Sequence, residues 1–304
     1  MTDIDYLTVQ APAPDWYREA MAQPGTVHRV NSNGCDIQYL RWSPPEGRTA
    51  LGGMLLVHGG GGHGHWWSHI APMLAQEYHV LAMDQAGMGD SGRRESYDSD
   101  SRAEDMLAVI DNAGLGPDAF VVGHSFGGLM AMRLGQQHGD RLGGIIIADS
   151  PVRPPELQDQ DAHQRPKMGN KRHYPDFETA LARFRLMPEQ TCDNAFLVEH
   201  IARRSLKQEA EGWCWKFDGD AMENRRFGEP FHQYLTEMKG RRAFVYGEDS
   251  ALIQPVITDW IRRTLGPSAP IVGVPKAQHH LLLDQPLAFV TTIRAILAGW
   301  LADN

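Results

Sequence analysis

Residues 121–128, with the sequence Val-Val-Gly-His-Ser-Phe-Gly-Gly, constrain the fold of this chain more than any other stretch. The apolar start predicts the end of a buried strand, and the residues that follow run on without a breaker, as a helix does. Glycines two positions either side of Ser125 complete the pattern Gly-x-Ser-x-Gly. In that pattern the serine sits at a sharp, strained turn where side chains at the glycine positions would meet neighbouring backbone. We therefore expect Ser125 to be a nucleophile, although a plain helix N-cap serine is the simpler interpretation.

The same rhythm of apolar strand, turn and helix recurs along the chain. Six apolar runs predict strands, at residues 51–57, 79–83, 120–122, 142–148, 242–246 and 271–274. Helical segments between them are typical of right-handed βαβ units. Residues 26–30 and 35–42 alternate in polarity around an Asn-Gly turn, which predicts an antiparallel pair at the sheet edge. The predicted fold class is α/β, with a mostly parallel central sheet flanked by helices.

The domain organisation follows from where this rhythm stops. Residues 1–25 read as an N-terminal arm with one short helix, and residues 26–150 and 241–304 form the α/β core. Between them, residues 151–240 contain several prolines in a polar stretch, followed by amphipathic segments. We interpret this part as an inserted helical cap, or lid, and not as another sheet layer.

Composition excludes several classes of protein. The 304 residues include 29 basic and 38 acidic side chains, and the formal charge of −9 argues against a nucleic-acid partner. No run approaches the roughly 18 apolar residues of a membrane helix, so no membrane partner is expected. Residues 1–5 are acidic where a targeting signal would be basic, so the expected location is cytoplasmic. The oligomeric state is not indicated.

A glycine-rich loop, residues 58–67, follows the first apolar strand and admits four interpretations. A phosphate-binding loop would need a Gly-Lys-Ser/Thr sequence, which is missing. A metal site would have to use the histidines but finds no carboxylate nearby; these are His58, His63, His65 and His69. A flexible loop is a third interpretation. We favour an oxyanion loop, in which residues without side chains let backbone N–H groups approach a substrate oxygen.

Two further turns carry polar residues at predicted strand ends. Residues 84–92 form a glycine-rich turn that we expect beside the serine turn, with Asp84 holding the turn together instead of acting in catalysis. His279 and His280 follow the last strand. Ligands bind at the carboxyl ends of parallel strands, so one of these histidines should face Ser125.

With His58-Gly59, Gly123-x-Ser125-x-Gly127 and His279 in this order, the chain resembles the α/β-hydrolases over residues 26–150 and 241–304. The resemblance implies a catalytic triad with Ser125 as nucleophile and a histidine base. His279 matches the base better than His280, although a glycine is usual where Gln278 stands. The resemblance also implies an oxyanion hole formed by the N–H groups of Gly60 and Phe126.

The acidic member of the triad has two candidates. The commoner family arrangement places it three positions beyond a glycine after a late strand, where Ser250 stands and Asp249 is one residue early. A subset of the family carries the acid at the end of the strand after the serine's helix, which is the place of Asp149. We favour Asp149 and keep Asp249 as the alternative.

The resemblance implies a serine hydrolase that cleaves a small carboxylic ester through an acyl-enzyme, with no cofactor and no metal. A carbon–carbon bond hydrolase, a cofactor-free haloperoxidase and a non-catalytic ligand receptor are the alternatives. Epoxide hydrolases and dehalogenases of this fold use a carboxylate nucleophile, and Ser125 argues against both. The aromatic residues of 212–218 form either buried core or an apolar wall over the site. The pocket candidates are His58, Trp66, His124, Trp213 and Trp215.

Overall fold

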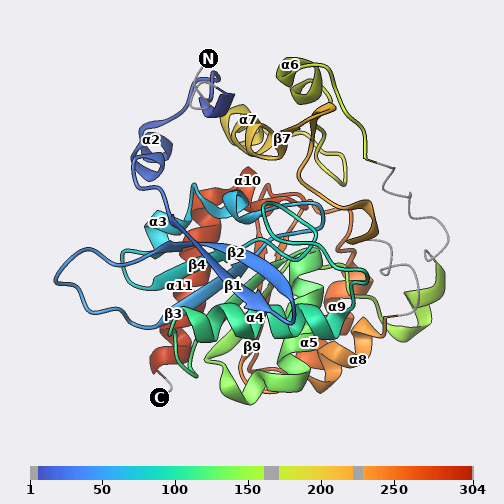
Figure 1. Ribbon diagram of the computed structural model, residues 1–304. Coiled ribbons are helices and arrows are strands. Elements are labelled where there is room, and N and C mark those ends of the chain that lie inside the picture. The colour runs from blue at the N-terminus through green and yellow to red at the C-terminus, as the bar shows by residue number, and fades with distance from the viewer. Residues whose placement is uncertain (1–5, 161–170, 222–228, 303–304) are drawn as a thin grey trace.

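The computed structural model describes residues 6–160, 171–221 and 229–302, with side chains undescribed for 158–160 (Figure 1). The acidic start at residues 1–5 and two parts of the predicted cap, 161–170 and 222–228, lie outside the described residues. An eight-stranded sheet runs through the middle of the chain's fold, in the order β1-β2-β4-β3-β5-β6-β9-β10. Its strands are β1 (Thr26–Ser32), β2 (Cys35–Trp42), β3 (Gly53–Val57), β4 (His79–Met83), β5 (Phe120–His124), β6 (Gly144–Ala148), β9 (Arg242–Gly247) and β10 (Ile271–Val274).

The six strands from β4 to β10 in this order pair in parallel, and β1 and β2 add an antiparallel edge. The fold class predicted from the sequence is therefore confirmed. One expectation about neighbours is wrong: β3 lies between β4 and β5, so the turn after β4 is not directly beside the serine turn. Strand order depends on long-range pairing, which the local apolar pattern does not encode.

Helices cover both faces of the sheet (Figure 1). Strand residues alternate between the two faces: Leu55 and Val57 pack in one core and Met54 and Leu56 in the other. The first core includes helices α4 (Ser99–Asn112), α5 (Phe126–His138), α8 (Phe231–Glu237) and α9 (Pro255–Leu265). The second core includes α2 (Asp15–Met21), α3 (Ala71–Leu74), α10 (Leu281–Asp284) and α11 (Pro286–Ala302). Central strands buried on both sides explain the continuous apolar runs in the sequence.

The hairpin β1–β2 closes through Asn33 and Gly34, whose φ angles are 48° and 81°. Two successive residues with positive φ are characteristic of the two-residue turns that match the twist of paired strands. Asparagine and glycine tolerate this conformation best, which is why the Asn-Gly signal predicted the hairpin.

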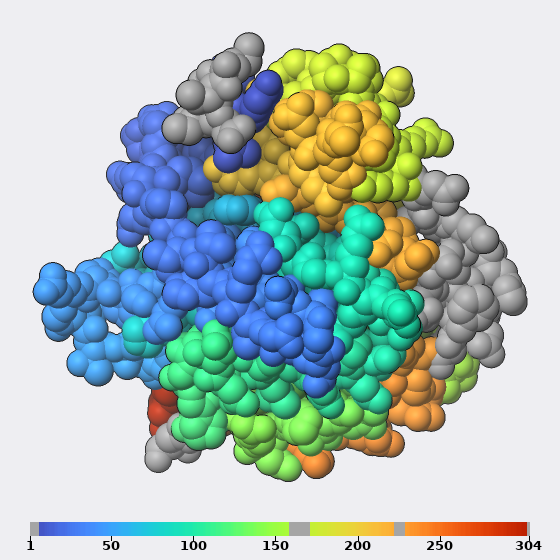
Figure 2. Space-filling view, viewed as in Figure 1, coloured from blue at the N-terminus to red at the C-terminus, as the bar shows by residue number. Residues whose placement is uncertain are grey.

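The inserted segment lines a cavity together with the glycine-rich loop that follows β3, and Figure 2 shows its yellow-green to gold residues beside the N-terminal residues in blue. Its described helices are η3 (Pro155–Gln160), α6 (Phe177–Leu181) and α7 (Ala195–Arg204). Unlike the purely helical segment expected from the sequence, it also contains an antiparallel pair, β7 (Leu206–Glu209) with β8 (Gly212–Trp215). Helix α8, by contrast, packs against α5 in the core layer.

The N-terminal residues pack on α7. The Tyr17 hydroxyl is 3.0 Å from His200 Nδ1, and the Glu199 carboxylate accepts hydrogen bonds from the backbone N–H groups of Gln10 and Ala11. These contacts tie the start of the chain to the inserted segment. No helix within the described ranges is both long and apolar enough to cross a membrane.

Candidate active site

Ser125 occupies the turn between β5 and α5 with φ 54° and ψ −118°. Positive φ is costly for a residue with a Cβ atom and marks a position that its surroundings hold in place. The Ser125 N–H donates to the carbonyl of Ala148 at the end of β6, over 2.8 Å. The strand–turn–helix unit read from the sequence is therefore present, with the serine side chain at the carboxyl edge of the sheet.

The two flanking glycines leave no room for side chains. A Cβ on Gly123 would lie 2.6 Å from the Gly127 carbonyl oxygen, and a Cβ on Gly127 would lie 2.5 Å from the carbonyl oxygen of His58. Real Cβ atoms do not approach backbone this closely. Helix α5 can therefore start directly against β3 and β5 only with glycine at both positions.

Three buried side chains form a hydrogen-bonded series at this turn. The Ser125 Oγ lies 2.9 Å from His279 Nε2, and His279 Nδ1 lies 2.7 Å from Asp149 Oδ1. A carboxylate only accepts hydrogen bonds, so His279 Nδ1 carries the proton. His279 Nε2 is then left as an acceptor for the serine hydroxyl. His279 and Asp149 are 3% and 0% exposed, which removes water as a competitor for either bond.

Asp149 follows β6 directly and is held by two further donors. The backbone N–H of Gly247 donates to Oδ2 and the Ser250 hydroxyl donates to Oδ1, both over 2.8 Å. The carboxylate that contacts His279 is thus Asp149, whereas the backbone N–H of Asp249 donates to the Ala277 carbonyl over 2.9 Å. The turn after β9, where Asp249 lies, supplies donors to Asp149.

The glycine-rich loop after β3 lies against Ser125. A Cβ on Gly59 would be 3.3 Å from the Ser125 Cβ atom. His58 anchors the loop: its Nδ1–H donates to the Gly59 carbonyl over 2.7 Å and its Nε2 accepts from the Gln85 N–H over 3.0 Å. Burial lowers the pKa of His58 to about 4, so the ring is neutral, as these two bonds require.

Backbone N–H groups border the serine on two sides. Gly60 is the next residue of the glycine-rich loop, and Phe126 is the first residue of the 13-residue helix α5. The first N–H groups of a helix have no partner within it and carry the positive end of the helix dipole. The two sequence-predicted oxyanion donors thus lie in elements that flank Ser125.

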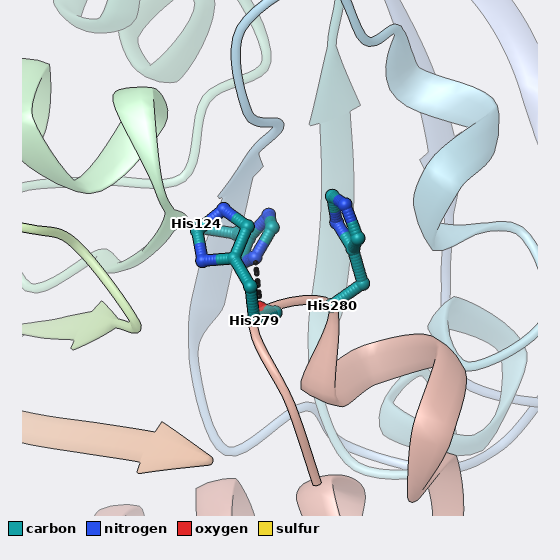
Figure 3. Close-up of side chains that lie close together, drawn as sticks. All are labelled: His124, His279 and His280. Atoms are coloured by element: carbon teal, nitrogen blue, oxygen red, sulfur yellow. Dashed lines mark hydrogen bonds between the residues drawn. The ribbon is translucent and has the colours of Figure 1, made fainter. Parts of the chain in front are cut away.

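Three histidine rings, those of His124, His279 and His280, lie close together next to Ser125 in the structure, and Figure 3 shows how they face one another. His124 Nε2–H donates to the His279 carbonyl over 2.9 Å, which leaves His124 Nδ1 without a proton and, within the described part of the chain, without a partner. Neither ring nitrogen of His280 has a hydrogen-bond partner there. Burial lowers the pKa of His124 to about 3 and that of His280 well below its usual value. One nitrogen from each of His124, His279 and His280 lies within 4.8 Å of the others, so this group could hold a metal ion.

The other loop histidines have separate partners. His63 Nε2 lies 2.9 Å from the Ser205 hydroxyl, His65 Nδ1 lies 3.0 Å from the Ser68 hydroxyl, and His69 Nε2–H donates to the Leu282 carbonyl over 2.9 Å. They therefore do not converge with His58 on one point. Asp84 accepts bonds from the N–H groups of Gly64 and Asp90, which matches the turn-holding role expected for it.

The pocket candidates occupy different places. Trp66 and Trp215 line a cavity of about 510 Å³ between the glycine-rich loop and the inserted segment. Trp213 instead packs edge-on against Tyr6 and Phe177, with ring centroids 5.1 and 5.0 Å away. His58 and His124 are buried behind the loop and the serine turn.

Sequence reasoning did not predict the hydrogen bonds by which three residues support the site. Gln85 fixes the His58 backbone, since its Nε2 donates to the His58 carbonyl over 2.7 Å, and Gly247 and Ser250 donate to Asp149. For Ser250 a signal existed, because the sequence has a serine where the commoner family arrangement has an acid. For Gln85 no local pattern gave a signal.

Comparisons with known proteins identify the family of the chain. A profile of the alpha/beta hydrolase family matches residues 54–292. The chain is 27% identical to esterase Rv0045c of Mycobacterium tuberculosis over 281 residues, which are 89% of each chain. It is 34% identical to epoxide hydrolase B of M. tuberculosis over 125 residues, 40% of this chain and 34% of the relative.

Among solved structures, E-2-(acetamidomethylene)succinate hydrolase superposes with a TM-score of 0.76 at 21% identity, covering 90% of this chain and 99% of the other. A likeness at that identity concerns the fold alone. The family profile, however, spans the strands, the serine turn and the histidine that make up the site. The chain belongs to the alpha/beta hydrolase family.

Proposed function

We propose that this hydrolase cleaves a carboxylic ester through an acyl-enzyme formed on Ser125. The observation that carries the proposal is the buried series Asp149–His279–Ser125, with contacts of 2.7 and 2.9 Å. Such a series makes a serine hydroxyl nucleophilic at neutral pH because a base is ready to take its proton. The similarity to an esterase over 89% of the chain supports an ester as the substrate.

In the proposed first step Ser125 Oγ attacks the ester carbonyl carbon while His279 Nε2 takes its proton. Asp149 keeps the other ring proton on Nδ1 and stabilises the positive charge that develops on the imidazole. The N–H groups of Gly60 and Phe126 bind the oxyanion. Each such donor typically contributes about 100- to 1,000-fold to the rate, so the loop matters as much as the base.

Collapse of the tetrahedral intermediate releases the alcohol, which leaves with the proton from His279. Water then attacks the acyl group with His279 again acting as the base, and Ser125 regains its proton as the carboxylic acid departs. No cofactor takes part in this cycle. We further propose that the inserted segment acts as a cap, because Phe184 and Trp215 from it line the cavity opposite the glycine-rich loop.

Epoxide hydrolysis receives less support. The matching part of epoxide hydrolase B covers only 40% of this chain. Relatives of that activity, as the family resemblance implies, use a carboxylate as the nucleophile, and Ser125 stands at that position here. A serine alkoxide would form an ether with an epoxide, which the same machinery does not hydrolyse.

Kinetics on p-nitrophenyl esters of graded acyl length test the proposal, with Ser125→Ala as the matched variant. We expect measurable kcat/KM for at least one ester and its loss to background in the variant, with unchanged thermal unfolding. Turnover that persists in Ser125→Ala would refute the proposed nucleophile. An ester panel without any Ser125-dependent turnover would refute ester hydrolysis and favour the carbon–carbon bond or receptor alternatives.

A further inference from the structure

The cavity of about 510 Å³ next to the glycine-rich loop has a composition unlike the rest of the chain. On one side it is lined by Gly60 and Trp66, and on the other by residues of the inserted segment. The Trp66 ring centroid is 5.3 Å from that of His280, which in turn is 4.8 Å from that of His279. The cavity therefore includes the proposed oxyanion donor Gly60, and the rings of Trp66 and His280 connect it to the proposed base His279.

Positive charge is concentrated in this cavity. Its lining includes four cationic side chains, while no aspartate or glutamate of the described segments lines it; the four are Arg172, Arg183, Arg185 and Lys216. The whole chain has the opposite balance, with 29 basic and 38 acidic residues. A local reversal of sign at the mouth of a site attracts anions and raises their encounter rate.

Three of the four cationic side chains have no carboxylate partner among the residues that the structure describes. Lys216 Nζ pairs with Asp90 over 2.7 Å. Within the described ranges, the Arg185 guanidinium donates to the carbonyls of Ala182 and Phe184, which carry no charge. Arg172 and Arg183 form no ion pair with any carboxylate of the described ranges. All three arginines are exposed, so their guanidinium groups are free to bind a ligand from solvent.

The remainder of the lining is apolar and aromatic. Phe184 and Trp215 face each other with ring centroids 6.0 Å apart, and Trp66, only 8% exposed, lies toward the site. A guanidinium presents two parallel N–H donors that match the two oxygens of a carboxylate or phosphate. The cavity is therefore suited to a molecule with an apolar body and an anionic end.

We propose that the substrate is an anionic ester, whose carboxylate or phosphate binds the arginine group Arg172, Arg183 and Arg185 while its ester carbonyl reaches Ser125. This inference rests on the proposed ester hydrolysis and names its substrate class. The aromatic side chains hold the apolar part of the substrate between these two ends. Because the arginines are exposed, salt screens their attraction for the substrate.

The kinetic test compares the p-nitrophenyl monoester of glutaric acid with its neutral methyl diester. We expect kcat/KM to favour the anionic ester. The preference should shrink as salt rises from about 0.01 M to about 1 M, over which the Debye length falls from about 30 Å to about 3 Å. Competition by glutarate and by inorganic phosphate distinguishes a carboxylate from a phosphate as the preferred anion.

Two matched triple variants distinguish the effect of the arginine group from the effect of a change in net charge. Replacing Arg172, Arg183 and Arg185 with glutamine should lower the anionic-to-neutral ratio of kcat/KM at least about eightfold, since each exposed ion pair contributes roughly two- to fivefold. The control replaces three exposed arginines that do not line the cavity, Arg48, Arg141 and Arg263. It changes the net charge by the same amount, and we expect it to leave the ratio unchanged. Equal ratios in the two triple variants would overturn the proposal.

A binding measurement keeps the outcome independent of turnover. Calorimetric titration of Ser125→Ala with the intact anionic ester should show tighter binding than with the neutral diester, and the arginine triple variant should lose the difference. Equal binding of both esters overturns the anionic substrate even if esters are hydrolysed. Selective binding without any Ser125-dependent hydrolysis would instead refute ester hydrolysis and leave the anion site supported.

Discussion

Replacing Asp149 with asparagine tests whether Asp149, and not Asp249, is the acidic partner of His279. The Asp149 carboxylate accepts three hydrogen bonds: from His279 Nδ1 and the Ser250 hydroxyl at Oδ1, and from the Gly247 N–H at Oδ2. An asparagine has only one acceptor oxygen and an NH₂ group in place of the other. Either orientation of the amide therefore breaks part of this network.

If the amide oxygen faces Gly247, the NH₂ group faces His279 and forces its proton from Nδ1 to Nε2. The ring can then no longer accept the serine proton, a change that costs about 10⁴-fold in kcat in Ser-His-Asp enzymes. If the amide flips, its NH₂ group meets the buried N–H of Gly247, and an unpaired buried donor costs about 1–3 kcal/mol. The charge that stabilises the imidazolium is lost in both cases.

We therefore expect kcat of Asp149→Asn on the best p-nitrophenyl ester to fall between about 10² and 10⁴-fold, or about 2.7–5.4 kcal/mol of barrier. Thermal unfolding by circular dichroism checks that the variant is folded. Asp249→Asn is the matched control and should stay within about threefold of the parent, less than about 0.7 kcal/mol. A folded Asp149→Asn that loses less than tenfold, with collapse of Asp249→Asn, would refute the reasoning.

Three further predictions concern packing, pH and metal ions. Gly123→Ala should lower the free energy of unfolding by about 1–3 kcal/mol or more, because its Cβ would meet backbone at 2.6 Å. Gly299→Ala, with nothing within 4 Å, should be neutral or stabilising, and similar melting of both would contradict the packing argument. The free energy of unfolding should fall as pH drops from 6.5 toward 4. Burial lowers the pKa of His69 to about 4, so in this window the imidazole binds a proton in the unfolded chain but not in the folded one. Urea titrations at a series of pH values give the free energy of unfolding of the parent and of His69→Gln. In this window the free energy of the variant should change with pH by up to about 1.4 kcal/mol per pH unit less than that of the parent, and an equal change in both would count against a neutral buried ring. Zn²⁺ should inhibit ester hydrolysis reversibly, with EDTA restoring activity, because one ring nitrogen from each of His124, His279 and His280 lies within 4.8 Å of the others. His280→Phe should then raise the half-inhibiting Zn²⁺ concentration at least about tenfold (~1.4 kcal/mol), whereas unchanged inhibition would place the ion elsewhere.

Much of the core could be predicted because its elements have local signatures. The strand of residues 79–83 and that of 271–274 appear with the expected bounds. Ser125 was identifiable because its turn requires glycine at two fixed positions. His279 was identifiable by its place after the last strand, where parallel strand ends bring distant residues to one edge.

Other features depend on contacts that no local pattern reports. Asp149 and Asp249 both follow strands, and only the pairing of β6 with β9 and the path of the following turns bring one of them to His279. The pair β7–β8 was missed because four-residue strands are too short to show a clear period. The arginine group was missed because it is assembled by the folding of the inserted segment over a distant loop.

The central claim is that Ser125 forms a covalent acyl-enzyme, and carbamoylation tests it most directly. p-Nitrophenyl dimethylcarbamate transfers a carbamoyl group that serine enzymes release slowly, so the intermediate can be isolated and mapped by peptide mass spectrometry. We expect one carbamoyl group per chain on the peptide that contains Ser125, with loss of ester hydrolysis in proportion and no label on Ser125→Ala. Full esterase activity after labelling, or a label confined to another residue, would contradict the account.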